Sequence, residues 1–192
     1  MPPTTLARDV LVPGDVVRVA ALTSVVVAAV SLEGVAVALF LLMLGGLMVP
    51  RAVGMPAVLD VAYGSALLLA AWAAQLGWYQ AVPWLDLPVH AACTGLIAAV
   101  AAVALTRWQV LPGPRDTSHA HRRTGVVVTT TGLGAVVAIL WEIGEWAGFT
   151  YLDDRIGVGY TDTVTDLASG LVGSVVAGMA LAVRPGRAGV RS

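Results

Sequence analysis

Residues 125–149 read GVVVTTTGLGAVVAILWEIGEWAGF, and the only charged side chains among them are those of Glu142 and Glu145. A helix needs about 20 largely apolar residues to cross the hydrocarbon core of a bilayer, so this segment is long enough to do so. Similar apolar segments recur along the chain. This pattern predicts an all-α, polytopic membrane helix bundle.

The composition of the whole chain supports a membrane protein. Of its 192 residues, 58% are hydrophobic and 12% are charged, and the mean hydropathy is +0.84. A soluble fold of this size has too little interior to bury so much apolar surface. The composition therefore excludes an ordinary cytosolic enzyme and a nucleic-acid-binding protein. The single cysteine, Cys93, excludes an internal disulfide and a zinc site built from cysteines.

The apolar segments predict six membrane-spanning helices in a single integral membrane domain over residues 1–192, at 16–32, 35–50, 56–78, 88–106, 125–149 and 163–183. Glu33 and Gly34 separate the first two segments and leave room only for a tight turn. The alternative is that these two segments form one surface helix and one span, which would give five crossings.

The arginines favour six crossings and indicate the orientation of the chain. With six spans, ten of the eleven basic residues, all of them arginine, fall on one side of the membrane, and only Arg155 falls on the other. Because basic residues accumulate on the cytoplasmic side, we expect both termini to be cytoplasmic. The aromatic residues Trp78, Tyr79 and Trp84 would then lie at the outer interface, where such side chains are enriched.

Three pairs of polar residues are expected at similar depth in the outer half of the bundle. Their members are three or four positions apart, which places each pair on one helix face. The pairs are Asp86 with His90, Glu142 with Glu145, and Asp162 with Asp166. We expect them to form one cluster, and charges inside a membrane require partners. Bound cations, shared protons or a water-filled cavity could each supply them, and Mg²⁺, Mn²⁺, Ca²⁺ and Zn²⁺ all suit such ligands.

Helix capping is the simpler explanation for part of this pattern. Asp86 could cap the fourth segment, and Asp162 or Thr163 could cap the sixth. Capping does not explain Glu142 and Glu145, because they lie at a helix C-terminus, where the helix dipole disfavours carboxylates.

The same residues resemble the motifs of the YjdF-like bacterial inner-membrane proteins, a family of unknown function. The matching residues are Asp86 and His90, then Glu142, Glu145 and Trp146, then Gly159, Asp162, Thr163 and Asp166. The resemblance covers residues 31–183 and implies a multi-pass protein of the bacterial cytoplasmic membrane. A weaker resemblance extends to VanZ-like proteins. Ala168 and Ser169 stand where that pattern has an Asn, so its role in glycopeptide resistance is not carried over.

The cluster leads to a functional hypothesis. We expect a divalent metal ion to be bound by Asp86, His90, Glu142, Asp162 and Asp166, with Glu145 as the catalytic general base. The protein would be a hydrolase or transferase acting on a lipid-linked or envelope substrate. The alternatives are a cation- or proton-coupled transporter and a non-catalytic protein whose metal or proton network joins helices. The metal identity, the substrate and the oligomeric state stay open.

Two further expectations concern packing. Asp60 is expected to pair with Arg51 near the cytoplasmic side. Gly170, Ser174 and Gly178 form a stripe of small residues, which allows close approach of a neighbouring helix. We expect that helix to belong to the same bundle, although a dimer interface is the alternative.

Overall fold

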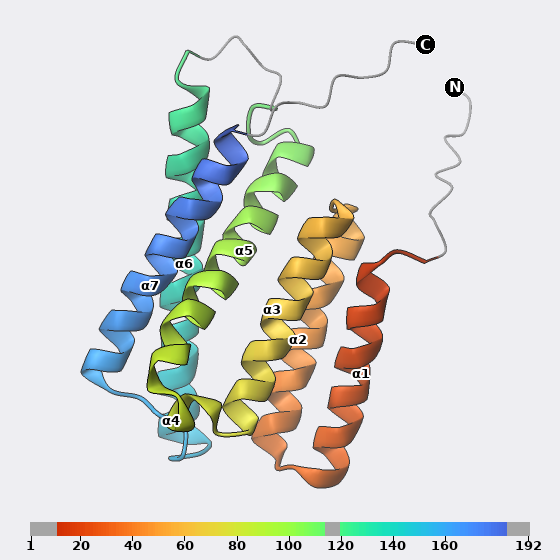
Figure 1. Ribbon diagram of the computed structural model, residues 1–192, viewed down its shortest axis with the longest axis vertical. Helices are drawn as coiled ribbons and strands as arrows, with labels where there is room; N and C mark the ends of the chain where they lie inside the picture. The colour runs from red at the N-terminus through yellow and green to blue at the C-terminus, as the bar shows by residue number, and fades with distance from the viewer. Residues whose placement is uncertain (1–10, 114–119, 184–192) are drawn as a thin grey trace.

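The computed structural model describes residues 11–113 and 120–183, which form an antiparallel bundle of six long helices (Figure 1). These are α1 (Gly14–Ser31), α2 (Gly34–Val53), α3 (Ala57–Gln75), α5 (Asp86–Arg107), α6 (Arg122–Tyr151) and α7 (Tyr160–Val183). A single-turn helix, α4 (Trp78–Ala81), and a 3₁₀ turn, η1 (Pro83–Leu85), connect α3 to α5. No strand occurs in the described part of the chain. The predicted all-α fold is confirmed.

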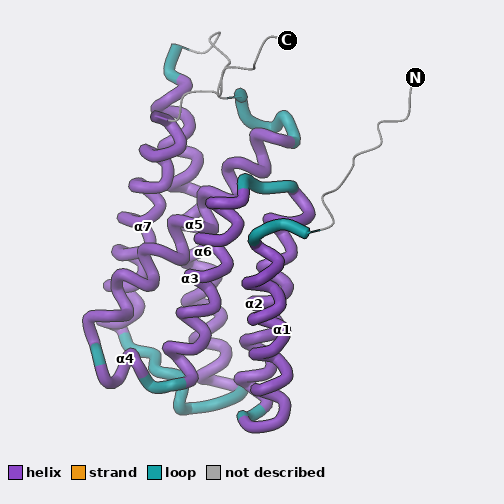
Figure 2. The backbone as a smooth tube through the Cα atoms, turned by 45° about the vertical axis from the view of Figure 1, so that its right-hand side comes forward, coloured by secondary structure: helices purple, strands orange, loops and turns teal. Residues whose placement is uncertain are grey.

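Each long helix is long and apolar enough to cross a membrane. All six predicted spans therefore correspond to helices that could cross a membrane. The packing of α1 along α2 and α3 favours six crossings over five. Leu32 and Glu33 adopt extended ψ angles of −178° and 168°, which end one helix before the other begins. The loops are confined to the two ends of the bundle (Figure 2). We call the end that holds the α1–α2 turn, α4, η1 and the α6–α7 loop the α4 end.

The third span ends earlier than the sequence indicated. The predicted segment ran to Trp78, whereas α3 ends at Gln75. Gly77 has a φ of +67°, a left-handed conformation that a glycine adopts without steric cost and that stops a right-handed helix. Trp78 then begins α4 in a new direction. Apolar composition continues through this turn, so hydropathy alone cannot detect it.

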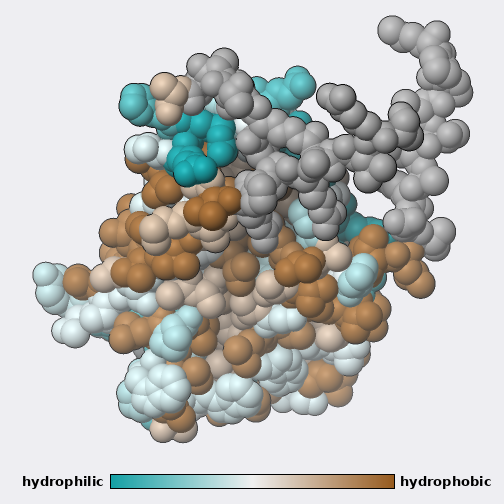
Figure 3. All heavy atoms as spheres, turned by 45° about the horizontal axis from the view of Figure 1, so that its top comes forward, coloured by the Kyte–Doolittle hydropathy of each residue, from teal (hydrophilic) through white to brown (hydrophobic). Residues whose placement is uncertain are grey.

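The helices form two groups of three, α1–α2–α3 and α5–α6–α7, which meet mainly where α3 packs against α5 (Figure 1). In the first group, Phe40 and Leu47 are fully buried, and the Phe40 ring lies 5.0 Å from the ring of Trp72. The Trp72 indole N–H donates a hydrogen bond of 3.0 Å to the Ser24 hydroxyl and so joins α3 to α1. Many large apolar side chains are exposed, and they cover much of the face drawn in Figure 3, as a lipid environment requires.

Small residues allow the second group to pack closely. A Cβ atom added to Gly95 on α5 would lie 2.6 Å from the backbone oxygen of Gly173 on α7, so only glycine permits this approach. The stripe of Gly170, Ser174 and Gly178 is buried on α7. It faces α5 and α6, which confirms the expectation that it packs within the bundle.

The partner expected for Asp60 was wrong. Arg51 was predicted, but the Asp60 carboxylate pairs with Arg18 at 2.6 Å. Arg51 pairs with Asp15 at 3.0 Å. Arg18 lies on α1, and its approach to Asp60 on α3 depends on helix packing rather than on nearness in sequence.

Candidate metal centre

Two helices that pack closely bring three potential metal ligands together at the α4 end. Asp86 is the first residue of α5, and His90 lies one turn further along it. Asp166 lies in the second turn of α7 and is buried. Because α5 and α7 approach closely at Gly95 and Gly173, Asp166 lies beside His90. We call Asp86, His90 and Asp166 the Asp–His–Asp group.

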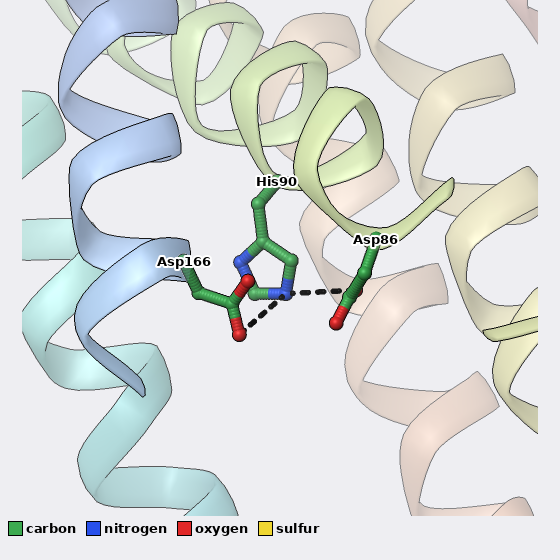
Figure 4. A group of neighbouring side chains, drawn as sticks. All are labelled: Asp86, His90 and Asp166. Atoms are coloured by element: carbon green, nitrogen blue, oxygen red, sulfur yellow. Dashed lines mark ion pairs between the residues drawn. The ribbon is translucent and has the colours of Figure 1, made fainter. Parts of the chain in front are cut away.

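One ring nitrogen of His90 faces both carboxylates of this group (Figure 4). Its Nε2 atom lies 3.4 Å from Oδ1 of Asp86 and 3.8 Å from Oδ2 of Asp166. One potential ligand atom from each of the three residues lies within 4.8 Å of the other two.

The two distances from His90 Nε2 are longer than hydrogen bonds, but they are close to the distance between two ligand atoms of one metal ion. An N–H···O hydrogen bond spans about 2.7–3.2 Å. Two ligands that each lie about 2.1 Å from a tetrahedral metal ion are about 3.4 Å apart. The geometry of the Asp–His–Asp group is therefore compatible with a common metal ion.

The surroundings of the group leave its acids without an arginine partner. The Asp166 side chain is only 3% exposed, whereas His90 and Asp86 are 16% and 23% exposed. Arg155, the one arginine at the α4 end in the described part of the chain, pairs instead with Glu33 and Asp153. A buried carboxylate requires a compensating partner. Partial exposure of Asp86 and His90 leaves one side of the group accessible.

The other three predicted site residues surround this group without joining it. Glu142, Glu145 and Asp162, which we call the flanking acids, all lie near enough to His90 to interact with it electrostatically. Glu142 also lies near Thr163 of α7, and Glu145 lies one helical turn beyond Trp141 on α6. The structure thus gathers all six residues in one region. The metal-ligand roles of Glu142 and Asp162, and the catalytic role of Glu145, stay predictions.

The helix ends weaken the capping explanation. The α5 N-terminus has no side-chain cap hydrogen bond, although Asp86 is its first residue. The α7 helix begins at Tyr160, so Asp162 and Thr163 already lie inside the helix. Capping therefore does not account for Asp86, and Asp162 lies in the first turn of α7 rather than before it.

Tyr79 on α4 lies partly buried at the same end of the bundle as the Asp–His–Asp group, which the sequence did not indicate. Its hydroxyl donates a hydrogen bond of 3.3 Å to the Ala70 carbonyl of α3. Burial, followed by the nearby Asp86 carboxylate, raises the pKa of Tyr79 above its usual range. Glu145 and Asp166 also act on it. The sequence indicated only an interfacial aromatic residue, because the Gly77 turn that directs Tyr79 inward is a tertiary feature.

The motifs that form this site agree with a family match. Residues 15–187 match the model of the family described as "Predicted membrane protein (DUF2238)". The chain belongs to this family. DUF2238 is the YjdF-like family of unknown function that the motifs resembled. No curated protein and no solved structure matches the chain.

Proposed function

We propose that this DUF2238 protein is a divalent-metal-dependent hydrolase or transferase that acts on a lipid-linked or envelope substrate. The observation that carries this proposal is the position of the His90 Nε2 atom, 3.4 Å and 3.8 Å from oxygens of Asp86 and Asp166. One imidazole and two carboxylates suit Zn²⁺ or Mn²⁺, because imidazole favours the former and carboxylates the latter.

The ligand number favours catalysis over a purely structural role. Three protein ligands leave coordination positions open for water or substrate, whereas structural zinc sites are closed by four. A bound ion would lower the pKa of its water and make it a nucleophile at neutral pH. Glu145 is the proposed general base, because it lies near His90 and Asp166 without belonging to the Asp–His–Asp group.

A phosphoester is the simplest substrate for such a site. In hydrolysis, the water oxygen forms a bond to phosphorus, the bond from phosphorus to the leaving oxygen breaks, and Glu145 transfers the water proton to that leaving oxygen. In transfer, an alcohol replaces water. Neither reaction needs an oxidant or a nucleotide.

A nearby pocket supports an amphipathic substrate. It has a volume of about 750 Å³ and lies at the α4 end, between the α1–α2 turn and the C-terminus of α6. Charged Glu33 and Arg155 line it together with apolar Val35 and Phe149. Phe149 lies one helical turn beyond Glu145 on α6, so the pocket and the proposed site lie at the same end of the bundle.

The proposed orientation places this site outside the cytoplasm. Of the described arginines, only Arg155 lies at the α4 end, while Arg18, Arg51, Arg107, Arg122 and Arg123 lie toward the opposite end. Because basic residues are enriched on the cytoplasmic side of a membrane, the opposite end would face the cytoplasm of the bacterial cell and the α4 end would face outward.

Metal analysis of the purified protein tests the proposal. The wild-type protein should retain about one equivalent of Zn²⁺ or Mn²⁺ after dialysis, and His90→Ala and Asp166→Asn should retain much less. Asp154→Asn is the matched control, because Asp154 is an exposed acid at the same end. A wild-type protein that binds neither ion would overturn the proposal.

Activity is tested with phosphoester lipids in mixed micelles. Glu145→Gln should keep its metal but lose phosphate release. Two other results would favour a different function over an enzyme. Metal-dependent ion flux into liposomes, lost in His90→Ala, would indicate a transporter. Tight metal binding with no turnover or flux, together with four or more protein ligands, would indicate a structural metal.

A further inference from the structure

The pocket at the α4 end lies between the beginning of one spanning helix and the end of another. Gly34 and Val35 in the first turn of α2 line one side, and residues from Phe149 to Tyr151 at the end of α6 line the other. The ends of spanning helices lie near the lipid headgroups. The pocket is therefore placed to receive a headgroup, and its apolar side chains suit the beginning of an acyl chain.

The two helix ends give the pocket opposite partial charges. Glu33 directly precedes α2 but makes no capping hydrogen bond, and the first turn of α2 holds no acidic residue. The free N–H groups of this helix end are therefore available to an anion. The last turn of α6 holds no basic residue, so its free carbonyl groups are available to a cation. A ligand that carries both charges matches this arrangement.

An exposed ion pair in the pocket repeats this polarity. The Arg155 guanidinium donates from Nη1 to Glu33 at 3.4 Å and also from Nη2 to the same carboxylate. Asp153 holds the Nε edge of this guanidinium at 2.9 Å. The side chains of Arg155 and Glu33 are 66% and 69% exposed, and exposed pairs contribute little to stability. A phosphate can replace Glu33 on Arg155, because both oxyanions accept paired hydrogen bonds from a guanidinium.

The charge of the lining disfavours a simple anion. The lining contains three acidic residues and one arginine, so an anion that displaced Glu33 would leave a negative charge without compensation. A zwitterion avoids this cost, because its phosphate pairs with Arg155 while its ammonium pairs with the released Glu33. A primary ammonium suits the site best, since it donates hydrogen bonds to carboxylate and carbonyl oxygens.

We propose that this pocket binds the headgroup of a zwitterionic phospholipid that carries a primary ammonium. The phosphate is held by Arg155 and the N-terminus of α2, and the ammonium by Glu33 and the carbonyl groups at the end of α6. This inference rests on the proposed function in one respect, because it names the class of lipid on which the enzyme acts. Binding of the headgroup itself requires no metal ion.

Binding of short-chain ligands to the full-length, metal-free protein tests the inference. Dihexanoylphosphatidylethanolamine should bind about tenfold more tightly than dihexanoylphosphatidic acid, which lacks the ammonium, and than phosphoethanolamine, which lacks the chains. Isothermal titration calorimetry in a nonionic detergent measures the three affinities. Equal affinity for phosphatidic acid would overturn the preference for a zwitterion. Equal affinity for phosphoethanolamine would overturn the assignment to a lipid.

Two substitutions at Gly34 separate charge from shape. No atom lies within 4 Å of a Cβ atom added there, so there is room for both Gly34→Asp and Gly34→Asn. The carboxylate of Gly34→Asp would compete with the phosphate, so this variant should bind phosphatidylethanolamine about tenfold more weakly than Gly34→Asn. Its unfolding temperature should not fall, because an acidic group stabilises a helix N-terminus. Equal affinities in the two variants would overturn the proposed phosphate position.

Substitutions of the ion pair complete the test. Arg155→Gln should weaken phosphatidylethanolamine binding, whereas Arg123→Gln, which removes an exposed arginine at the opposite end, should match wild type. Glu33→Gln should bind phosphatidic acid more tightly than wild type, because no carboxylate then competes for Arg155. Wild-type affinity in Arg155→Gln would overturn the inference and leave metal binding intact. A wild-type protein that binds the lipid but no metal would refute the proposed function alone.

Discussion

Arg18 and Asp60 form a buried ion pair between α1 and α3, with 2.6 Å between Nη2 and Oδ1. The same guanidinium donates to Asp15 on its own helix and to the Leu47 carbonyl of α2. One side chain thereby connects the three helices of the first group. Gly14 makes this possible, because a Cβ atom there would collide with the Asp60 carboxylate.

Removing one partner of this pair should destabilise the protein strongly. Asp60→Ala removes a carboxylate that balances the charge of the buried Arg18 guanidinium. Breaking a buried ion pair in this way costs about 3 kcal/mol or more. Thermal and denaturant unfolding in detergent, followed by tryptophan fluorescence, measures the effect. Asp154→Ala, which removes an exposed acid, should stay within about 0.5 kcal/mol of wild type.

Removing both partners should be less harmful than removing one. In Arg18→Met/Asp60→Leu no charge of the pair is left buried, and Asp15 keeps its 3.0 Å pair with Arg51. The double variant should therefore recover much of the stability lost in Asp60→Ala. If the double variant lost as much stability as Arg18→Met and Asp60→Leu lose together, the cost would not come from an uncompensated charge.

Gly95→Ala should disturb both packing and metal binding. Its Cβ atom would lie 2.6 Å from the Gly173 oxygen, a backbone atom that cannot move unless α5 and α7 separate. We expect a loss of about 1–3 kcal/mol and weaker metal binding, because these helices carry the Asp–His–Asp group. Gly132→Ala on α6 is the control, since no atom lies within 4 Å of its added Cβ. Wild-type stability and affinity in Gly95→Ala would refute the prediction.

The ion pair between Asp153 and Arg155 should weaken in acid. Arg155 pairs with Glu33 of the α1–α2 turn and with Asp153. Hydrogen bonds from the Arg155 side chain and then its backbone N–H hold the pKa of Asp153 below its usual range. The resulting stabilisation is present above the unfolded pKa of about 3.9 and is lost as pH falls through the folded value.

Asp153→Asn should therefore show a smaller decrease in unfolding temperature than wild type between pH 5 and pH 3. All other titratable groups are the same in the two proteins, so the difference isolates this carboxylate. High salt should reduce the difference, because the Arg155 partner of Asp153 is exposed to solvent and the pair is screened. Identical pH profiles would show that the Asp153–Arg155 pair contributes nothing measurable.

Cysteine labelling tests the proposed orientation. In a Cys93→Ala background, a membrane-impermeant maleimide added to intact cells should label Asp154→Cys at the α4 end. It should label Thr124→Cys, near the α6 N-terminus at the opposite end, only after the cells are opened. Both native side chains are exposed, so access should depend on the side of the membrane. The reverse pattern would place the candidate metal centre in the cytoplasm.

The sequence by itself determined the membrane class, the six spans and the pairs of polar residues on helix faces. Apolar length and helical periodicity are local properties, and a residue at position 86 shares a face with one at position 90 wherever the helix packs. The order of the Asp86, Glu142 and Asp162 motifs is also a property of the sequence alone, and it was enough to indicate the family.

Only the tertiary structure decided which of these residues meet. The close approach of α5 and α7 at Gly95 and Gly173 puts Asp166 beside His90, while Glu142 and Asp162 stay outside the group of three. Packing of α1 on α3 gives Asp60 the partner Arg18, and the left-handed Gly77 directs Tyr79 inward. Distances between helices depend on how whole surfaces fit together, and no local pattern in the sequence contains that information.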